Sequence, residues 1–208
     1  MLDQSLQLHF PNIGILGNSL SDDELKPLWK EVNSILNSEN ASFVNHFHAG
    51  NVKKEFAIID CLSYLESKII PLTNEFKSTF NYRDLNTNRK LKITKCWVNF
   101  QEKTEFMSAH FHEGILSFVI WLRVPFMMAD ELNHNTLSEK TSITGPSFNI
   151  HYTDVLGQVQ LNAMPVDNSW EGRMIMFPSR MSHSVHPFYT SDEYRICIAG
   201  NLDYDIAT

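Results

Sequence analysis

The sequence has few cysteines and no long apolar run, and each shortage argues against a class of protein. Its three cysteines, Cys61, Cys96 and Cys197, form no CxxC pair. This argues against a zinc ribbon, a thioredoxin-type site and a disulfide framework. The longest apolar runs, such as FVIWL, are far shorter than the roughly 18 residues that span a bilayer. We therefore expect no membrane partner.

Clustered positive charge is also missing, and the formal net charge is -7. Non-specific binding to nucleic acid is therefore not expected. The N-terminal stretch MLDQSLQLHFPNIG has no basic region followed by an apolar run, so we do not expect a signal peptide. Together with the scattered cysteines, this favours the cytoplasm. The length of 208 residues and the 43% hydrophobic content fit a single domain spanning residues 1–208.

Residues 1–90 are predicted to form a helical N-terminal elaboration. SLSDDELKPLWKEVNSIL has a helix start signal, in which Ser21 is the N-cap candidate and Glu24 completes a capping box. A second helical segment is expected over residues 60–80, bent near Pro71. We predict that these helices pack on the part of the chain that follows.

Short strands are predicted over residues 91–204. LKITKCWVNFQ alternates between apolar and polar residues, and GILSFVIWLRVPF is a continuous apolar run typical of a buried strand. SFNIHYTD, GQVQLNAMP, GRMIMFPS, SHSVHPF and YRICIAGNLDY follow at short intervals. This spacing favours a β-sandwich or barrel. The expected fold class is α+β, mainly β.

Two histidines in SAHFHEG, His110 and His112, are candidate metal ligands. Residues i and i+2 of a strand point to one face, so an HxH pair presents two imidazoles side by side. His183, in FPSRMSHSVHPF, is the best candidate for a third ligand from a later strand. Three ligands on one face leave open positions of the kind found in non-haem iron enzymes. The alternative is an ordinary pair of hydrogen-bonded histidines.

Arg195 is a candidate carboxylate-binding residue. It shares one strand face with Cys197 and Ala199, and an arginine inside a β-barrel is costly unless it is paired. Its planar guanidinium suits a carboxylate, which would fit a 2-oxoacid cosubstrate that chelates a metal at its other end. The alternative is a surface residue paired with Glu193 or Asp192.

The chain resembles 2-oxoglutarate/Fe(II)-dependent oxygenases of a type found often in phage genomes, which are relatives of prolyl hydroxylases. CWVNFQEKTEFMSAHFHEGILSFVIWLRVP and GRMIMFPSRMSHSVHPFYTSDEYRICIAGNL carry the resemblance, over roughly residues 91–202. These proteins share a Trp-x-Asn strand, an HxH before an apolar strand, an FPS turn, a histidine and a late arginine. The ordered set is specific, although each piece alone is not.

The resemblance implies a double-stranded β-helix, or jelly-roll, core and the cofactors Fe(II) and 2-oxoglutarate. Carried over by residue, the metal ligands and catalytic residues are His110, His112 and His183, and Arg195 holds the distal carboxylate. The implied reaction hydroxylates a C–H bond of a protein side chain, for example a prolyl group, or of a small metabolite, and releases succinate and CO2. A phage-encoded enzyme would act in the host cytoplasm.

The sequence departs from the wider superfamily, in which an Asp or Glu stands where His112 stands here. The residues leave three alternatives open: His112 binds the metal, a β-bulge turns Glu113 inward, or only His110 and His183 bind and the last position is open or taken by an external ligand. We favour the first because it needs no irregularity in the strand.

Other residues are weaker candidates. Asn99 and Tyr152 are predicted to contact the cosubstrate, with ordinary strand packing as the alternative for both. The polar stretch 127–146 is long enough to be a lid or an insertion near the entrance. A second HxH, His46 and His48, lies in a polar loop with no third ligand organised around it, so we do not expect it to bind metal.

Two rival functions remain at the level of sequence. GRMIMFPSRMSH follows a cupin motif in its Gly, Pro and His spacing, which would give a three-histidine dioxygenase or isomerase without 2-oxoglutarate. The glutamate of the first cupin motif is missing, because Glu113 comes too early. A jelly-roll can also be a non-enzymatic virion or binding module.

Overall fold

The computed structural model describes residues 13–38, 41–44, 50–86, 88–134 and 145–205. Its elements are β1 (Leu16–Ser19), α1 (Asp22–Leu36), β2 (Lys54–Ala57), α2 (Leu62–Ile69), α3 (Leu72–Phe80), β3 (Leu91–Gln101), β4 (Met107–His110), β5 (Leu116–Arg123), α4 (Met128–Asn133), β6 (Ser147–Thr153), β7 (Val159–Pro165), the 3-10 turn Asn168–Trp170, β8 (Arg173–Pro178), β9 (Ser182–Val185) and β10 (Arg195–Tyr204). The predicted change from helices to strands near residue 91 is confirmed.

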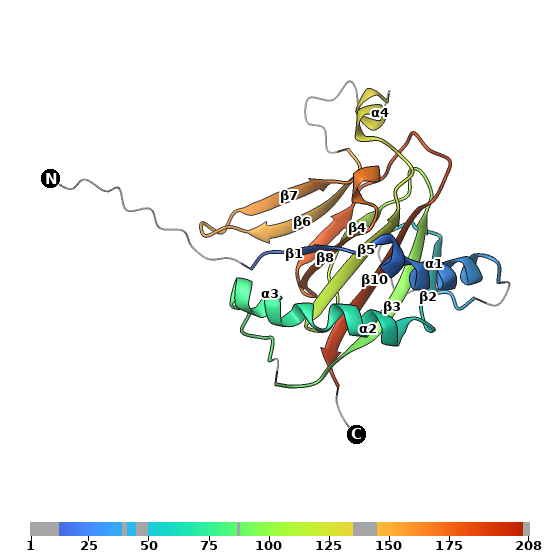
Figure 1. Ribbon diagram of the computed structural model, residues 1–208. Helices are drawn as coiled ribbons and strands as arrows, with labels where there is room; N and C mark the ends of the chain where they lie inside the picture. Colours follow the sequence, from blue (N-terminus) through green and yellow to red (C-terminus); the bar gives the residue numbers. More distant parts are fainter. Residues whose placement is uncertain (1–12, 39–40, 45–49, 87, 135–144, 206–208) are drawn as a thin grey trace.

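The strands of the described ranges form two antiparallel sheets. The larger has the order β1-β8-β5-β10-β3-β2, and the smaller has the order β4-β9-β6-β7. Strands that follow one another in the sequence repeatedly lie in different sheets, as Figure 1 shows. The chain thus winds between the two sheets and builds the predicted jelly-roll core.

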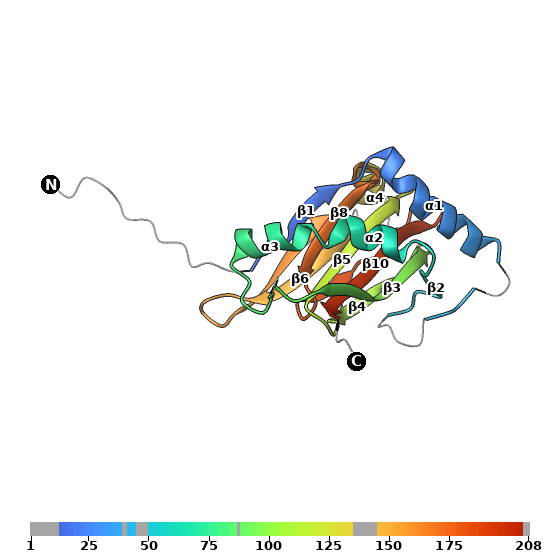
Figure 2. The ribbon, with the colours of Figure 1, turned by 60° about the horizontal axis from the view of Figure 1, so that its bottom comes forward.

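Helices α1, α2 and α3 cover the outer face of the larger sheet (Figures 1 and 2). The capping box at the start of α1 is present, since the backbone N–H of Ser21 donates to the Glu24 carboxylate at 3.0 Å. The predicted bend at Pro71 separates α2 from α3. Apolar side chains of helices and sheet share one buried cluster, which includes Leu28, Val32, Leu65, Ile69, Phe76, Val98, Phe100 and Ile198. We therefore propose that residues 1–208 form one domain.

A second apolar cluster lies between the two sheets. It is rich in aromatic side chains, among them Trp121, Phe148, Phe177 and Phe188. Burying such large rings supplies much of the apolar contact in a core. Many of its residues line the cavity that contains the candidate site.

Several local features differ from the expectations or fall outside them. The sequence patterns missed β1 and β2, which lie at the two edges of the larger sheet. Part of the proposed lid is helix α4, whereas residues 135–144 lie outside the described residues, as do His46 and His48.

Within the described ranges, no helix is both long and apolar enough to cross a membrane.

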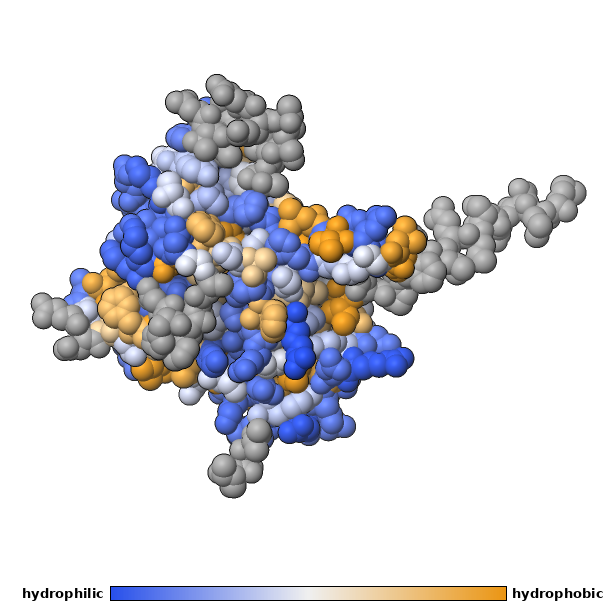
Figure 3. Space-filling view, turned by 180° about the vertical axis from the view of Figure 1, so that it is seen from behind, coloured by the Kyte–Doolittle hydropathy of each residue, from blue (hydrophilic) through white to orange (hydrophobic). Residues whose placement is uncertain are grey.

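The β6–β7 hairpin carries an exposed apolar surface. Val155, Leu156 and Val159 are each more than 70% exposed. They lie at and beside the turn of the β6–β7 hairpin, which forms one edge of the smaller sheet and projects to the left in Figure 1; apolar residues are visible on this side at the right of Figure 3. None of these three residues lines the cavity that contains the candidate site.

Candidate metal and cosubstrate site

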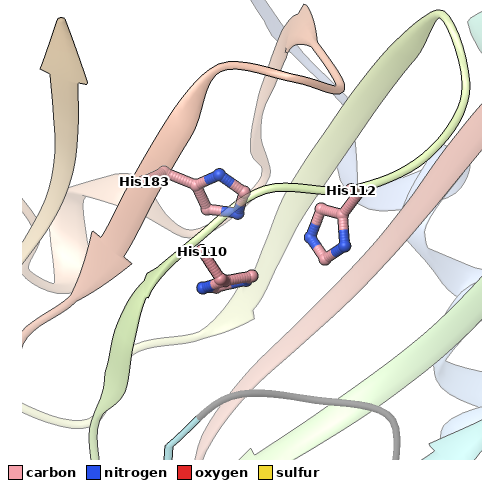
Figure 4. Close-up of side chains that lie close together, drawn as sticks. All are labelled: His110, His112 and His183. Atoms are coloured by element: carbon pink, nitrogen blue, oxygen red, sulfur yellow. The ribbon is translucent and has the colours of Figure 1, made fainter.

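The structure brings the three predicted histidines together at one end of the space between the sheets. His110 is the last residue of β4 and pairs in register with His183 on β9. His112 follows β4 on the segment that leads to β5, and Figure 4 shows its ring beside the other two. One ligand nitrogen of each ring lies within 4.8 Å of those of the others. This spacing allows the three imidazoles to hold one metal ion.

The segment after His110 differs from the prediction, because β4 ends there and His112 lies outside the strand. The side chains nevertheless continue to alternate between inward and outward directions beyond the end of the strand. Phe111 is 66% exposed, and the backbone N–H of His112 donates to the carbonyl of Ser179 at 2.8 Å. The side chain of Glu113 is 93% exposed and lies 3.9 Å from the ammonium of a lysine. The alternative in which a bulge turns Glu113 inward is therefore wrong.

Backbone carbonyls fix the orientation of two of the imidazoles. Nδ1 of His110 lies 2.7 Å from the carbonyl oxygen of Ser108, and Nδ1 of His183 lies 2.9 Å from that of Met181. Because a carbonyl oxygen can only accept, each Nδ1 must carry the proton and donate. Each ring then keeps the lone pair of Nε2 for a metal. Such contacts are typical of histidine ligands.

The environment of His183 keeps its ring neutral. Burial, followed by the positive charge that His110 can carry, lowers the pKa of His183 to about 4, although the Met181 carbonyl opposes this shift. The ring stacks on Phe148, with centroids 5.4 Å apart, and meets Phe177 edge-on at 5.0 Å. A neutral imidazole in an apolar wall needs no deprotonation before it binds a metal.

A cavity between the sheets connects the histidines to Arg195. The inner faces of β3 and β10 form one of its walls. Three cross-strand pairs follow one another along this wall: Trp97 with Ala199, Asn99 with Cys197, and Gln101 with Arg195. Trp97 lies at the histidine end, where its ring centroid is 5.4 Å from that of His112. The predicted alternation of Arg195, Cys197 and Ala199 on one face is confirmed.

Arg195 is buried, with 1% of its surface exposed. Its guanidinium donates from Nε to Oε1 of Gln101 at 3.1 Å and from Nη2 to the His186 carbonyl at 3.3 Å. No carboxylate of the described residues lies within 4.0 Å of it, and Glu193 and Asp192 pair with other cations at the surface. The surface alternative is therefore wrong. Burial lowers the pKa of Arg195, and a buried cation in a cavity suits an anionic ligand.

The two weaker candidates have different positions. Asn99 lines the cavity, and its Oδ1 is buried without a hydrogen-bond partner among the described residues. Since amide oxygen and nitrogen can exchange places, this side chain can offer either an acceptor or a donor to a ligand. Tyr152 is 40% exposed near the end of β6 and does not line the cavity. The structure therefore does not bring Tyr152 to the site.

The sequence patterns missed Gln101 as a residue of the site. It lies two residues after Asn99 on the alternating strand β3, and it touches Arg195 directly. The alternation of β3 is a signal for its inward direction. Its contact with Arg195 depends on the register of β3 against β10, which the alternation does not give.

A wider groove of about 510 Å³ adjoins the cavity beside His112. Trp97, His112 and Asn201 line both spaces, so the groove opens next to the candidate metal centre. Its other walls are mainly apolar and include Val44, Ala57, Ile58, Leu62 and Ile93. Mainly apolar walls with a few polar groups are typical of sites for organic ligands.

Comparison with known families identifies the class of the protein. A family model described as "Putative 2OG-Fe(II) oxygenase" matches residues 95–201, more than half of the chain. The chain belongs to this family, and it is an enzyme, an oxidoreductase of the 2-oxoglutarate/Fe(II) oxygenase class. Fe(II) and 2-oxoglutarate are the cofactors of this class. Membership favours the oxygenase over the cupin and the non-enzymatic module. No curated protein matches the chain significantly.

Solved structures support the fold. A Pseudomonas putida prolyl-4-hydroxylase is 15% identical, with a TM-score of 0.55 over 92% of this chain and 93% of that one. A Trichoplax adhaerens prolyl hydroxylase, in complex with a hypoxia-inducible-factor peptide, is 15% identical, with a TM-score of 0.52 over 92% and 82%. HygX from Streptomyces hygroscopicus, with nickel and 2-oxoglutarate bound, is 10% identical, with a TM-score of 0.52 over 94% and 85%. These similarities show the double-stranded β-helix fold.

Proposed function

We propose that His110, His112 and His183 bind the Fe(II) of this oxygenase and that Arg195 binds the distal carboxylate of 2-oxoglutarate. The observation that carries the proposal is that the three histidines and a buried arginine without a carboxylate partner line one cavity. The histidines offer a centre for the metal and the oxoacid end of the cosubstrate. The arginine, at the far end of the wall, offers a partner for its other carboxylate.

The chemistry of the donor set fits Fe(II). Imidazole nitrogen is a common ligand of iron, and three ligands leave positions open for the oxoacid and O2. All three proposed ligands are neutral, so the centre keeps the full charge of the ion. We expect the anionic carboxylate at the oxoacid end of 2-oxoglutarate to offset part of this charge. That role usually falls in part to the protein carboxylate that His112 replaces.

With both cofactors bound, the site would supply oxidation: 2-oxoglutarate and O2 yield succinate and CO2, and one oxygen atom enters a substrate C–H bond. The protein's own contribution is to place these groups. Arg195 orients the cosubstrate, Asn99 offers an amide beside it, and the aromatic rings around His183 exclude water. We propose that the groove beside His112 admits the substrate, which is a protein side chain, for example a prolyl group, or a small metabolite.

Metal titration of alanine variants tests the ligand assignment. Substitution of His110, His112 or His183 by alanine should each weaken anaerobic Fe(II) binding by about tenfold or more, because each removes a ligand. His151→Ala is the matched control, since its Nε2 contacts the hydroxyl of Ser184 at 2.9 Å and it is not part of the cluster. Affinity unchanged in His112→Ala would remove His112 from the ligand set.

A further inference from the structure

Gln101 joins the buried arginine to the main chain. It is the last residue of β3 and lies opposite Arg195 in the register of β10. Its Oε1 accepts hydrogen bonds from Nε and Nη2 of Arg195, at 3.1 and 2.5 Å. Its Nε2 donates to the carbonyl of Glu105. The side chain is 5% exposed, so it holds the guanidinium in a place that water hardly reaches.

The Glu105 carbonyl determines which end of the amide faces the arginine. Because this carbonyl can only accept, Nε2 of Gln101 must point to it, and Oε1 must point to the guanidinium. The partner of Arg195 is therefore a neutral oxygen. A buried arginine is ordinarily paired with a carboxylate. Here Nε and Nη2 of Arg195 have hydrogen-bond acceptors while the positive charge is not neutralised.

The other polar groups near Arg195 also leave the positive charge of its guanidinium available to a ligand. The Glu131 carboxylate favours the charged guanidinium, but its oxygens accept the backbone N–H groups of Tyr189 and Thr190 at 2.8 to 3.1 Å. The His186 carbonyl accepts from Nη2 and is neutral. Within the described part of the chain, no acceptor contacts Nη1 of Arg195. One nitrogen and the full charge thus remain for a ligand in the cavity.

We propose that Gln101 is a positioning residue that sets the specificity for a dicarboxylic cosubstrate. It fixes the guanidinium through a neutral amide, so that the charge of Arg195 is kept for the distal carboxylate. This inference rests on the proposed function, because it takes Arg195 as the partner of the cosubstrate. A glutamate at this position would accept the same N–H groups from Arg195 and lose the donor to the Glu105 carbonyl. Its negative charge would neutralise the arginine and repel the ligand.

Binding of two oxoacids by Gln101→Glu tests the inference. We would measure Kd by calorimetry on anaerobic, Fe(II)-loaded protein, for 2-oxoglutarate and for 2-oxopentanoate, which has a methyl group in place of the distal carboxylate. The variant should bind 2-oxoglutarate about tenfold to a hundredfold more weakly. Its affinity for 2-oxopentanoate and for Fe(II) should stay within about threefold, since neither involves the distal carboxylate.

Gln101→Met is the second variant, because it removes the acceptor without adding charge. It should weaken 2-oxoglutarate binding by less than about tenfold, since the arginine keeps its charge. A merely structural role predicts a similar loss of both oxoacids in each variant, because Gln101→Glu also loses the donor to the Glu105 carbonyl and Gln101→Met loses both ends of the amide. An equal loss of both oxoacids in Gln101→Glu, or a larger loss of 2-oxoglutarate affinity in Gln101→Met than in Gln101→Glu, would overturn the inference. If the wild-type protein itself binds no 2-oxoglutarate, the proposed function fails as well, and the two failures are thereby distinguished.

Discussion

Replacing Arg195 with methionine should abolish cosubstrate binding without destabilising the cofactor-free fold. Arg195 is 1% exposed and has no carboxylate partner within 4.0 Å among the described residues. The variant loses the hydrogen bonds to Gln101 and to the His186 carbonyl, at about 1 kcal/mol each. It also loses the desolvation cost of a buried charge, which amounts to several kcal/mol. We therefore expect the free energy of unfolding to remain within about 1 kcal/mol of the wild type or to rise.

Thermal unfolding with and without 2-oxoglutarate measures both parts of this expectation. For metal-loaded wild-type protein, cosubstrate at a hundred times its Kd should add about 2.7 kcal/mol of stability. 2-Oxoglutarate should add no measurable stability to Arg195→Met. Arg123→Met is the control, because Arg123 pairs with Glu193 at the surface and its side chain is 46% exposed. This account of Arg195 would be refuted if Arg195→Met lost several kcal/mol of unfolding free energy without ligand, or if 2-oxoglutarate still stabilised it.

Three further substitutions test the fold and the ligand set. Glu31→Gln should cost about 1–3 kcal/mol at neutral pH, because the carboxylate accepts the backbone N–H groups of residues 59–61 at 2.6 to 2.9 Å. Burial opposes ionisation of Glu31, but these bonds and the Cys61 thiol outweigh it and lower the pKa. This stabilisation is therefore fully present above the pKa that Glu31 has in the unfolded chain, and it is lost as the pH falls through the lower pKa of Glu31 in the folded protein. Denaturant titrations of the wild type and of Glu31→Gln at several pH values would show this loss. Glu113→Gln should leave Fe(II) affinity unchanged in the titration used for the histidines, since its side chain is 93% exposed; a large loss would bring Glu113 back as a ligand. Gly200→Ala should lower the melting temperature through a loss of about 1–3 kcal/mol, because a Cβ there would lie 2.6 Å from the ring of Phe118 and 2.8 Å from a backbone oxygen; an unchanged melting temperature would contradict the packing.

Local patterns were sufficient to predict much of the fold. The capping box at Ser21 and the bend at Pro71 are signals within a few residues, and both appear where expected. The alternation of Arg195 with its neighbours correctly predicted a face that points into the cavity. His183 was proposed as the partner of His110 because strands distant in the sequence can be neighbours in a sandwich or barrel, and the resemblance to a family gave the same set.

Features that depend on register or on distant neighbours were not predictable in the same way. Strand β2 has the mixed sequence KEFA, and it is a strand because it pairs with β3. Tyr152 shares the inward face of β6 with Phe148, but it lies four residues further along, where it is 40% exposed. Alternation gives the direction of a side chain and not its distance along the barrel. For the same reason the contact of Gln101 with Arg195 was missed.

The absorption spectrum of the anaerobic protein tests the central claim most directly. The claim is that this cavity binds Fe(II) through its histidines and 2-oxoglutarate beside them. Addition of Fe(II) and then of 2-oxoglutarate to the wild-type protein should produce a visible metal-to-ligand charge-transfer band, which His112→Ala should lose or weaken strongly. A wild-type protein without such a band would contradict the cosubstrate site, and a band that is unchanged in His112→Ala would contradict the three-histidine centre.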